Sequence, residues 1–233
     1  MNKNIYKFNL FNSKDIVAGI STRYFGDIKT KKNLNRFLGA MNIDTKKIVL
    51  AKQIHSEKVS IIDSAKKKII NNADGLITNK KNIALGIVTA DCLPIIFHDE
   101  NKGIIGVAHA GYKGLIKGII QQMVKKIKDL NGDLKNIKVC IGPSIGPCCY
   151  DVPQKRIKMF DKKLNKLNSF KLRKGKYFLD LKDIAKKILL KEKINIKNIQ
   201  LSKLCTKCNI DNFFSYRGDG KSFGEFVTVV QRL

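Results

Sequence analysis

The chain has 233 residues, and its 43% hydrophobic content is enough for one substantial core, so we expect a single α/β domain over residues 1–233. No apolar run reaches the length of a bilayer span, and the N-terminal residues are too polar for a signal peptide. We therefore expect a cytoplasmic protein without a membrane partner. The net charge of +27 comes mostly from dispersed lysines rather than an arginine-rich stripe, so no specific nucleic-acid partner is expected.

The first half of the chain contains short apolar segments that predict buried strands. Residues 83–88 and 104–108 are such segments, each bounded by glycine or polar residues. Pro94 places the TADC segment at the end of a strand, before the strand-like IIFHD resumes. Residues 114–130 carry apolar side chains at helical spacing, which predicts one amphipathic helix ending near Asn131 and Gly132.

The second half continues this alternation of strands and helices. A strand is predicted over 138–146, where it runs into a Gly/Pro turn, and the charged segment 155–176 predicts a helix followed by a turn at Gly175. Residues 180–193 predict a second helix capped by Asp180, and 223–233 a terminal strand. Interleaved strands and helices indicate an α/β or mixed α+β fold.

Three segments each present a side chain that can bind a metal. They are KQIHS at 52–56, TADCLPI at 89–95 and VAHAGYKG at 107–114, and they contain His55, Cys92 and His109. His/Cys/His is a common ligand set for a catalytic zinc that keeps one position open. The spacing is long and irregular, so the three side chains converge only if their segments line one cleft. His55 is predicted on a strand with Val59 and Ile61, and His98 at the surface.

Cys92 has a second interpretation. A thiol near a histidine can act as a nucleophile, with His109 as its base, instead of binding zinc. Residue types alone leave a zinc enzyme and a zinc-free cysteine hydrolase equally open. A third class is a basic binding module without catalysis.

The other five cysteines are interpreted as small buried hydrophobic residues near a site wall. Cys205 and Cys208 form a C-x-x-C pair without a second pair at zinc-ribbon spacing. The adjacent Cys148 and Cys149 are not expected to bind one ion together. Neither a structural zinc nor a disulfide framework is therefore expected.

Taken together, these segments resemble one family. It is the laccase-domain, or polyphenol oxidoreductase, family of zinc-dependent purine nucleoside phosphorylases with adenosine deaminase activity. The matching stretches follow the family's order: STR at 21–23, NR at 35–36, AKQIHSEKV at 51–59, ADGLIT at 73–78, TADCLPIIF at 89–97, GVAHAGYKG at 106–114, IGPSIGPCCYDV at 141–152 and CTKCNIDNFFSYRGDG at 205–220. Because IGPSIGPCCY and TADCLPI are highly specific, the chain is identified as a member of this family.

The resemblance implies layered mixed sheets flanked by helices, and one catalytic zinc held by His55, Cys92 and His109. It implies phosphorolysis of adenosine, inosine and S-methyl-5'-thioadenosine to the free base and ribose 1-phosphate, together with adenosine deamination. Copper-dependent polyphenol oxidation is also associated with the family. Multicopper chemistry is a poor match for a His/Cys/His set without methionine or further histidines.

Two dipeptide segments depart from the family pattern. Tyr112 and Lys113 stand where the family usually has Trp-Arg, and Gly224 and Glu225 where it has Gly-Arg. Lysine lacks the bidentate fork of arginine, and Glu225 reverses a charge. If the family's arginine at that position helps to hold phosphate, phosphorolysis is expected to be weak, and hydrolysis or deamination to dominate.

Further site residues follow from charge and from position in the matching segments. Arg23, Lys113 and Arg217 are the candidates for phosphate, and Gln53 and Tyr112 for the rest of the substrate. Asp91 is a candidate proton shuttle, or else a residue that orients a ligand. Purine nucleosides and phosphate are the expected partners, and the chain is expected to be a monomer or a small homo-oligomer.

Overall fold

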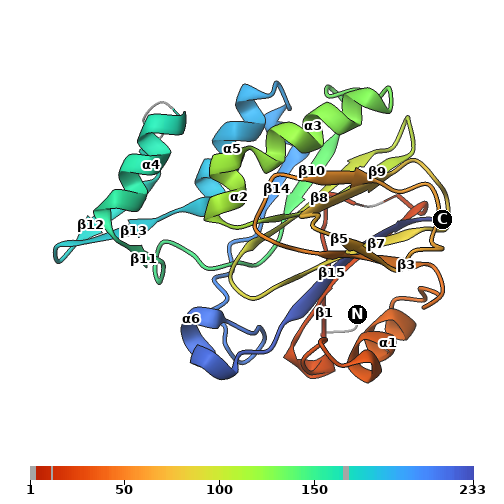
Figure 1. Ribbon diagram of the computed structural model, residues 1–233, viewed down its shortest axis with the longest axis horizontal. Coiled ribbons are helices and arrows are strands. Elements are labelled where there is room, and N and C mark those ends of the chain that lie inside the picture. Colours follow the sequence, from red (N-terminus) through yellow and green to blue (C-terminus); the bar gives the residue numbers. More distant parts are fainter. Residues whose placement is uncertain (1–3, 12, 165–167) are drawn as a thin grey trace.

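Two stacked β-sheets, with helices on both outer faces, make up most of the molecule (Figure 1). The computed structural model describes residues 4–11, 13–164 and 168–233. The predicted mixed α+β class is confirmed.

The first sheet is mixed, with β15 antiparallel to its neighbours and β3 parallel to both of its own. Its strands follow the spatial order β1 (Ile5–Tyr6), β2 (Ile16–Ser21), β15 (Phe226–Arg232), β7 (Ala84–Thr89), β3 (Ile48–Lys52) and β5 (Ile69–Asn71).

The second sheet is centred on an antiparallel pair, β8 and β9. Its strands follow the order β14 (Ile199–Leu201), β10 (Lys138–Ile141), β8 (Leu93–Asp99), β9 (Ile104–Ala110), β6 (Gly75–Thr78) and β4 (Val59–Ile61).

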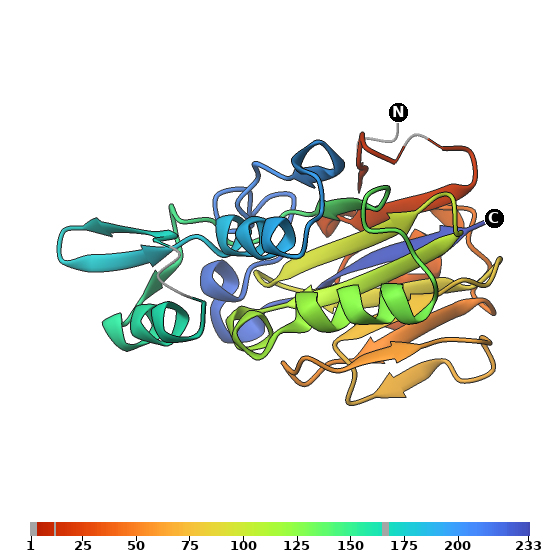
Figure 2. The same ribbon diagram turned by 90° about the horizontal axis from the view of Figure 1, so that it is seen from above.

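The described residues form six α-helices. They are α1 (Lys31–Ala40), α2 (Tyr112–Lys117), α3 (Ile119–Asp129), α4 (Gln154–Leu164), α5 (Leu181–Lys191) and α6 (Tyr216–Asp219), with short 3-10 turns at Arg23–Phe25, Ile196–Asn198 and Gly220–Ser222. A small sheet extends with α4 from one end of the molecule (Figure 2); its order is β11 (Asp151–Val152), β13 (Lys176–Leu179) and β12 (Phe170–Arg173).

Strand β8 shows why two layers form. All seven of its residues are buried, so both of its faces are covered. Since side chains alternate along a strand, Ile95 and Phe97 pack in the cluster that includes α3 and α5, whereas Ile96 packs between the two sheets. On the opposite side of the molecule, α1 covers the first sheet through Phe37 and Leu38. The core therefore comprises three clusters: one between each helical layer and its sheet, and one between the two sheets.

Several predicted elements are confirmed with small changes in their bounds. Residues 83–88 and 104–108 belong to β7 and β9, and the terminal segment forms β15. Asp180 caps α5, because its side chain accepts a hydrogen bond from Asp183 N at 3.0 Å. Gly175 forms the predicted turn with a φ of 72°, but it joins β12 to β13.

Other predictions are wrong. The helix expected over 114–130 is broken at Gly118, whose φ of 105° ends α2 and begins α3. His98 is buried in β8 rather than exposed, because Phe11 lies against its ring at 5.9 Å between centroids. Cys148 and Cys208 are exposed, so the interpretation as buried hydrophobic residues fails for them.

Among the described residues, no helix is long and apolar enough to cross a membrane.

Candidate metal centre

The pairing of β8 with β9 brings Cys92 and His109 together. In this antiparallel ladder Pro94 lies opposite His109 and Leu93 opposite Ala110. Cys92 directly precedes β8, so its thiol lies beside the end of β9 that carries His109. Two residues 17 positions apart become neighbours because the strands between them form a hairpin.

His55 reaches the same place from a turn. It follows β3 with a φ of 58°, so it does not lie on the predicted strand, although Val59 and Ile61 do lie on β4. The turn wraps around the carboxylate of Asp74, which is fully buried just before β6. The Asp74 oxygens accept hydrogen bonds from the backbone N–H groups of Ile54 (3.2 Å), His55 (3.0 Å) and Ser56 (2.7 Å), and from the Ser56 hydroxyl (2.7 Å).

Asp74 also holds the second histidine. Its Oδ1 lies 2.8 Å from Nδ1 of His109, and its carbonyl oxygen accepts the His109 N–H at 2.7 Å. With Nδ1 engaged in this way, Nε2 is the ring nitrogen left to bind a metal. A single buried carboxylate therefore positions both histidines.

The three predicted ligands meet. Their ligand atoms lie within 4.8 Å of one another, and the rings of His55 and His109 are 4.7 Å apart at an interplanar angle of 86°. Gly111 closes this cluster: a Cβ at this position would lie 2.9 Å from Cys92 Sγ and 3.3 Å from the His55 ring. The backbone approaches the ligands too closely for any residue but glycine.

Neighbouring groups in the cluster shift each other's pKa values toward the charged forms. Burial alone raises the pKa of the Cys92 thiol, but His109 and His55 outweigh that effect and lower the pKa to about 7. Burial alone lowers the pKa of His109, yet the neighbouring Cys92 and Asp74 raise it to about 9. The pKa of Asp74 is lowered despite burial, because His109 and the Ser56 and Ile54 donors stabilise its charge. Without a metal, the cluster favours a thiolate beside an imidazolium.

The ligand cluster lies at the wall of a cavity of about 960 Å³. Ile28, Leu50 and Leu181 belong to its apolar lining. Its cationic lining consists of Lys29, Lys31, Lys52, Arg156 and Arg217. A cavity of this size and character accommodates a small organic molecule that carries an anionic group.

The sequence-predicted site residues divide into two groups. Gln53, Asp91, Tyr112 and Arg217 line the cavity with the ligands. The Gln53 amide is engaged with the backbone of Val88, at 2.6 and 2.9 Å.

Arg23 and Lys113 do not belong to the cavity lining. The Arg23 guanidinium lies over Phe214 and pairs with Asp219, and Lys113 is exposed on α2.

Asp91 is held tightly by its neighbours. It adopts a φ of 88°, and its two carboxylate oxygens accept hydrogen bonds from the Thr206 hydroxyl at 2.6 Å and Arg217 N at 2.7 Å. Its backbone oxygen accepts the Ile145 N–H at 2.9 Å. These contacts fix the turn that presents Cys92.

Sequence reasoning missed Asp74 and Arg156 as residues of the site, and it singled out Glu225 only as a departure from the family pattern. Asp74 lies in the ADGLIT segment, but its partners are distant in the sequence. Arg156 belongs to the charged segment without clear pattern, yet its guanidinium lies 4.0 Å above the Tyr112 ring and faces the cavity. Glu225 lines the cavity as well, and burial raises the pKa of its carboxyl group.

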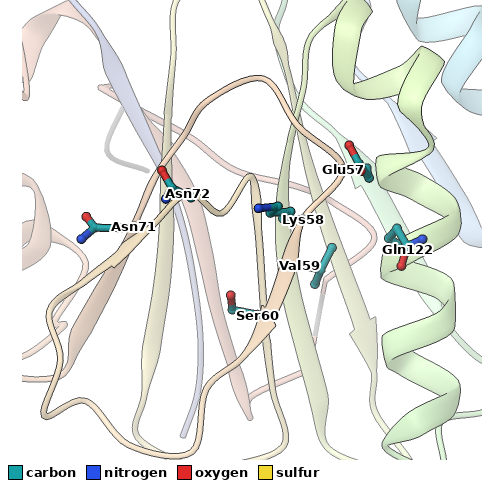
Figure 3. A pocket seen from close by; sticks show the side chains of 7 residues that line it. All are labelled: Glu57, Lys58, Val59, Ser60, Asn71, Asn72 and Gln122. Atoms are coloured by element: carbon teal, nitrogen blue, oxygen red, sulfur yellow. The ribbon is translucent and has the colours of Figure 1, made fainter.

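A second hollow, of about 600 Å³, lies beside β4 and α3 (Figure 3). It is lined by Glu57, Lys58, Val59, Ser60, Asn71, Asn72 and Gln122. None of the three clustered ligands belongs to this lining, so the chemistry is assigned to the larger cavity.

Comparison with known proteins places this site in a wider group. The family described as multi-copper polyphenol oxidoreductase laccase matches residues 25–232. A purine nucleoside phosphorylase of Borreliella burgdorferi is 38% identical, over 82% of this chain and 85% of its own length. Adenosine deaminase RL5, from an unknown prokaryotic organism, is 29% identical over 82% and 78%. The crystal structure of Bacillus licheniformis hypothetical protein YfiH has a TM-score of 0.86 and 27% identity, over 94% of this chain and 93% of that one.

The role of Asp74 leads to a first prediction. Asp74→Asn keeps the shape of the side chain but removes the charge that orients His109. The affinity of the cluster for an added metal ion, tested with zinc, should therefore fall about 10- to 100-fold in competition with a chromophoric chelator. The pKa of Asp74 is lowered in the folded protein, so its ionised form contributes stability above the ordinary value of 3.8, and this contribution is lost as pH falls. The difference in unfolding free energy between wild type and variant should therefore be large at pH 7 and shrink in acid.

Asp63→Asn is the matched control, since it removes the same charge from an exposed position. Unchanged zinc affinity in Asp74→Asn would contradict the positioning role.

Proposed function

This chain belongs to the multi-copper polyphenol oxidoreductase laccase family, and from that premise we propose that it is a purine nucleoside enzyme with its reactive centre at His55, Cys92 and His109. The observation that carries the proposal is the meeting of three metal-binding side chains at the wall of a cavity large enough for a nucleoside. The names of the relatives supply the substrate class, purine nucleosides and phosphate.

The donor set suits zinc. Two imidazoles and a thiolate are a common zinc ligand set that leaves the fourth position open, and the Asp74–His109 hydrogen bond is typical of zinc-binding histidines. When bound in such a site, zinc acts as a Lewis acid and lowers the pKa of water. Multicopper chemistry fits less well, because the third histidine of the chain, His98, is buried against Phe11, apart from this cluster.

Phosphorolysis is the first proposed reaction. A phosphate oxygen forms a bond to C1′ of the ribose, and the bond from C1′ to the purine nitrogen breaks. The electron pair of that bond stays on the nitrogen, which takes up the proton that the attacking hydrogen phosphate loses. We assign the phosphate to Arg156 and Arg217. The Arg156 guanidinium is stacked on Tyr112 and donates to the Tyr150 hydroxyl at 3.4 Å, so its fork is held at the cavity. This arginine compensates for Lys113, which lies outside the cavity lining.

Deamination of adenosine is the second proposed reaction. The oxygen of water forms a bond to C6 of the purine, and the amino group leaves as ammonia after gaining a proton. In zinc deaminases a carboxyl group moves such a proton. Asp91 was the sequence candidate, but both of its oxygens accept hydrogen bonds from Thr206 and Arg217. We therefore assign the proton transfer to Glu225, which lines the same cavity and whose pKa is raised by burial.

Metal content and turnover test the central proposal together. Wild type reconstituted with zinc should convert adenosine with and without phosphate, and Cys92→Ala should lose both the activities and the zinc of this cluster. Cys140→Ala is the matched control, because this buried thiol lies outside the metal-binding clusters. The cysteine-hydrolase alternative would be favoured if metal-free wild type turned over substrate in the presence of chelators. In that case thiol alkylation or substitution of His109 should abolish turnover.

Glu225 makes a separate prediction. Glu225→Gln should lower kcat for deamination by roughly 10²- to 10⁴-fold, the usual contribution of a positioned acid or base. The same change removes a negative charge from the cavity, so the KM for phosphate should fall rather than rise. Zinc content should stay constant. Glu57→Gln, which removes a carboxylate outside this cavity, should leave all three quantities unchanged. Equal losses in both reactions would contradict the assignment.

The phosphate site is tested by two cationic residues. Arg156→Lys keeps the charge but loses the bidentate fork, so the KM for phosphate should rise roughly tenfold or more while deamination without phosphate is retained. Lys113→Ala should change neither parameter, because Lys113 lies outside the cavity lining. A raised KM for phosphate in Lys113→Ala, with an unchanged KM in Arg156→Lys, would instead assign phosphate binding to Lys113.

A further inference from the structure

Four of the five cysteines outside the first centre form a second cluster. Cys148 and Cys149 lie on the turn that follows β10, and Cys205 and Cys208 on the turn that follows β14. The four sulfur atoms lie within 4.8 Å of one another. Cys208 Sγ is 3.4 Å from Cys148 Sγ and 3.4 Å from Cys149 Sγ. Two segments nearly 60 residues apart thus direct four thiols at one point.

The backbone holds the two turns together. Ser144 and Cys205 form a parallel bridge, in which Thr206 N donates to Ser144 O at 3.1 Å. Gly146 N donates to Cys205 Sγ at 3.2 Å, and Asn209 N closes the C-x-x-C turn onto Cys205 O at 3.0 Å. A backbone N–H directed at sulfur stabilises a thiolate, so the peptide groups favour a charged ligand here.

The spacing of the sulfur atoms matches tetrahedral coordination. Four thiolates at about 2.3 Å from a central zinc lie about 3.8 Å from each other, within the range of separations in the cluster. Four thiolates and one divalent cation carry a net charge of about −2, which a nearby cation offsets. Lys182 lies close enough to interact with Cys205 and Cys148, and its amine donates to Leu204 O at 2.6 Å.

We propose that Cys148, Cys149, Cys205 and Cys208 form a second metal site, which binds one zinc ion in a structural role. None of these residues lines the larger cavity, beside His55, Cys92 and His109, so the site is separate from the reactive centre. The adjacent Cys148 and Cys149 both act as ligands, contrary to the expectation from sequence. The ion fastens the turn after β10 to the turn after β14 and leaves no position open for substrate.

Hydrogen bonds to Asp91 connect the four-cysteine site to the reactive centre. Thr206, between the two cysteines of the C-x-x-C turn, donates to the Asp91 carboxylate, and Ile145 beside Gly146 donates to the Asp91 backbone. Asp91 directly precedes Cys92. Loss of the ion at the four cysteines should therefore weaken the packing around Asp91 and Cys92, although His55, Cys92 and His109 all remain present.

Counting metal in matched variants tests the proposal. Proteins purified and reconstituted with zinc under anaerobic, reducing conditions should hold two ions per chain in wild type and in Cys140→Ala. Cys92→Ala should hold one, Cys148→Ser/Cys208→Ser should hold one, and the triple variant none. The serine substitutions fall at exposed positions, so the fold is expected to persist. Circular dichroism and gel filtration verify the fold of each variant.

The retained ion identifies its own ligands. X-ray absorption of zinc-loaded Cys92→Ala should show sulfur neighbours only, at about 2.3 Å. Chelation of that ion should lower the thermal transition of Cys92→Ala and have no such effect on the triple variant. A folded Cys92→Ala without zinc, zinc with nitrogen neighbours, or a disulfide among the four cysteines in protein kept reduced would each overturn the proposal. If zinc-loaded wild type fails to turn over nucleosides while Cys92→Ala still retains one zinc, that result would count against the proposed function alone.

Discussion

The buried carboxylate of Asp74 is the interaction on which the candidate metal centre depends. Removing a carboxylate from water is costly unless hydrogen bonds and opposite charge compensate. Here the N–H groups of the 54–56 turn, the Ser56 hydroxyl and the His109 ring supply that compensation. The same contacts bring His55 and His109 to one place, so the carboxylate whose burial they compensate also assembles the site.

Strain in the backbone accompanies the site. His55 and Asp91 both adopt positive φ values, which non-glycine residues rarely do, and each is held by hydrogen bonds rather than by intrinsic preference. Each turn positions one candidate ligand. The first turn positions His55 itself, and the turn at Asp91 positions the next residue, Cys92. The stacked sheets surround these turns, since Asp74 directly precedes the buried strand β6 and Cys92 directly precedes the buried strand β8.

Local patterns in the sequence predicted what local physics decides. Short apolar runs predicted β7 and β9, the C-terminal segment predicted β15, and the segment capped by Asp180 predicted α5. The residue types around His55, Cys92 and His109 indicated the candidate ligands. Features made by distant partners were missed. The break at Gly118 preserves the apolar face, so periodicity does not reveal it, and His98 is buried by Phe11 from another part of the chain.

Asp74 and Arg156 show the same limit within the site, and the cysteines show it outside. The Asp74 side chain meets partners up to 35 residues away, and Arg156 is one cation among many until it is stacked on Tyr112. A single C-x-x-C pair does not indicate a four-thiol cluster. Cys148 and Cys149 lie in a distant segment, which the Ser144–Cys205 bridge brings beside this pair. That bridge also joins the cluster to Asp91 through Thr206, so a zinc ion among the thiols and the ligand Cys92 would share one mechanical support. The two metal sites are then different in chemistry but coupled in stability, since ordering either turn reduces the entropy lost in ordering the other.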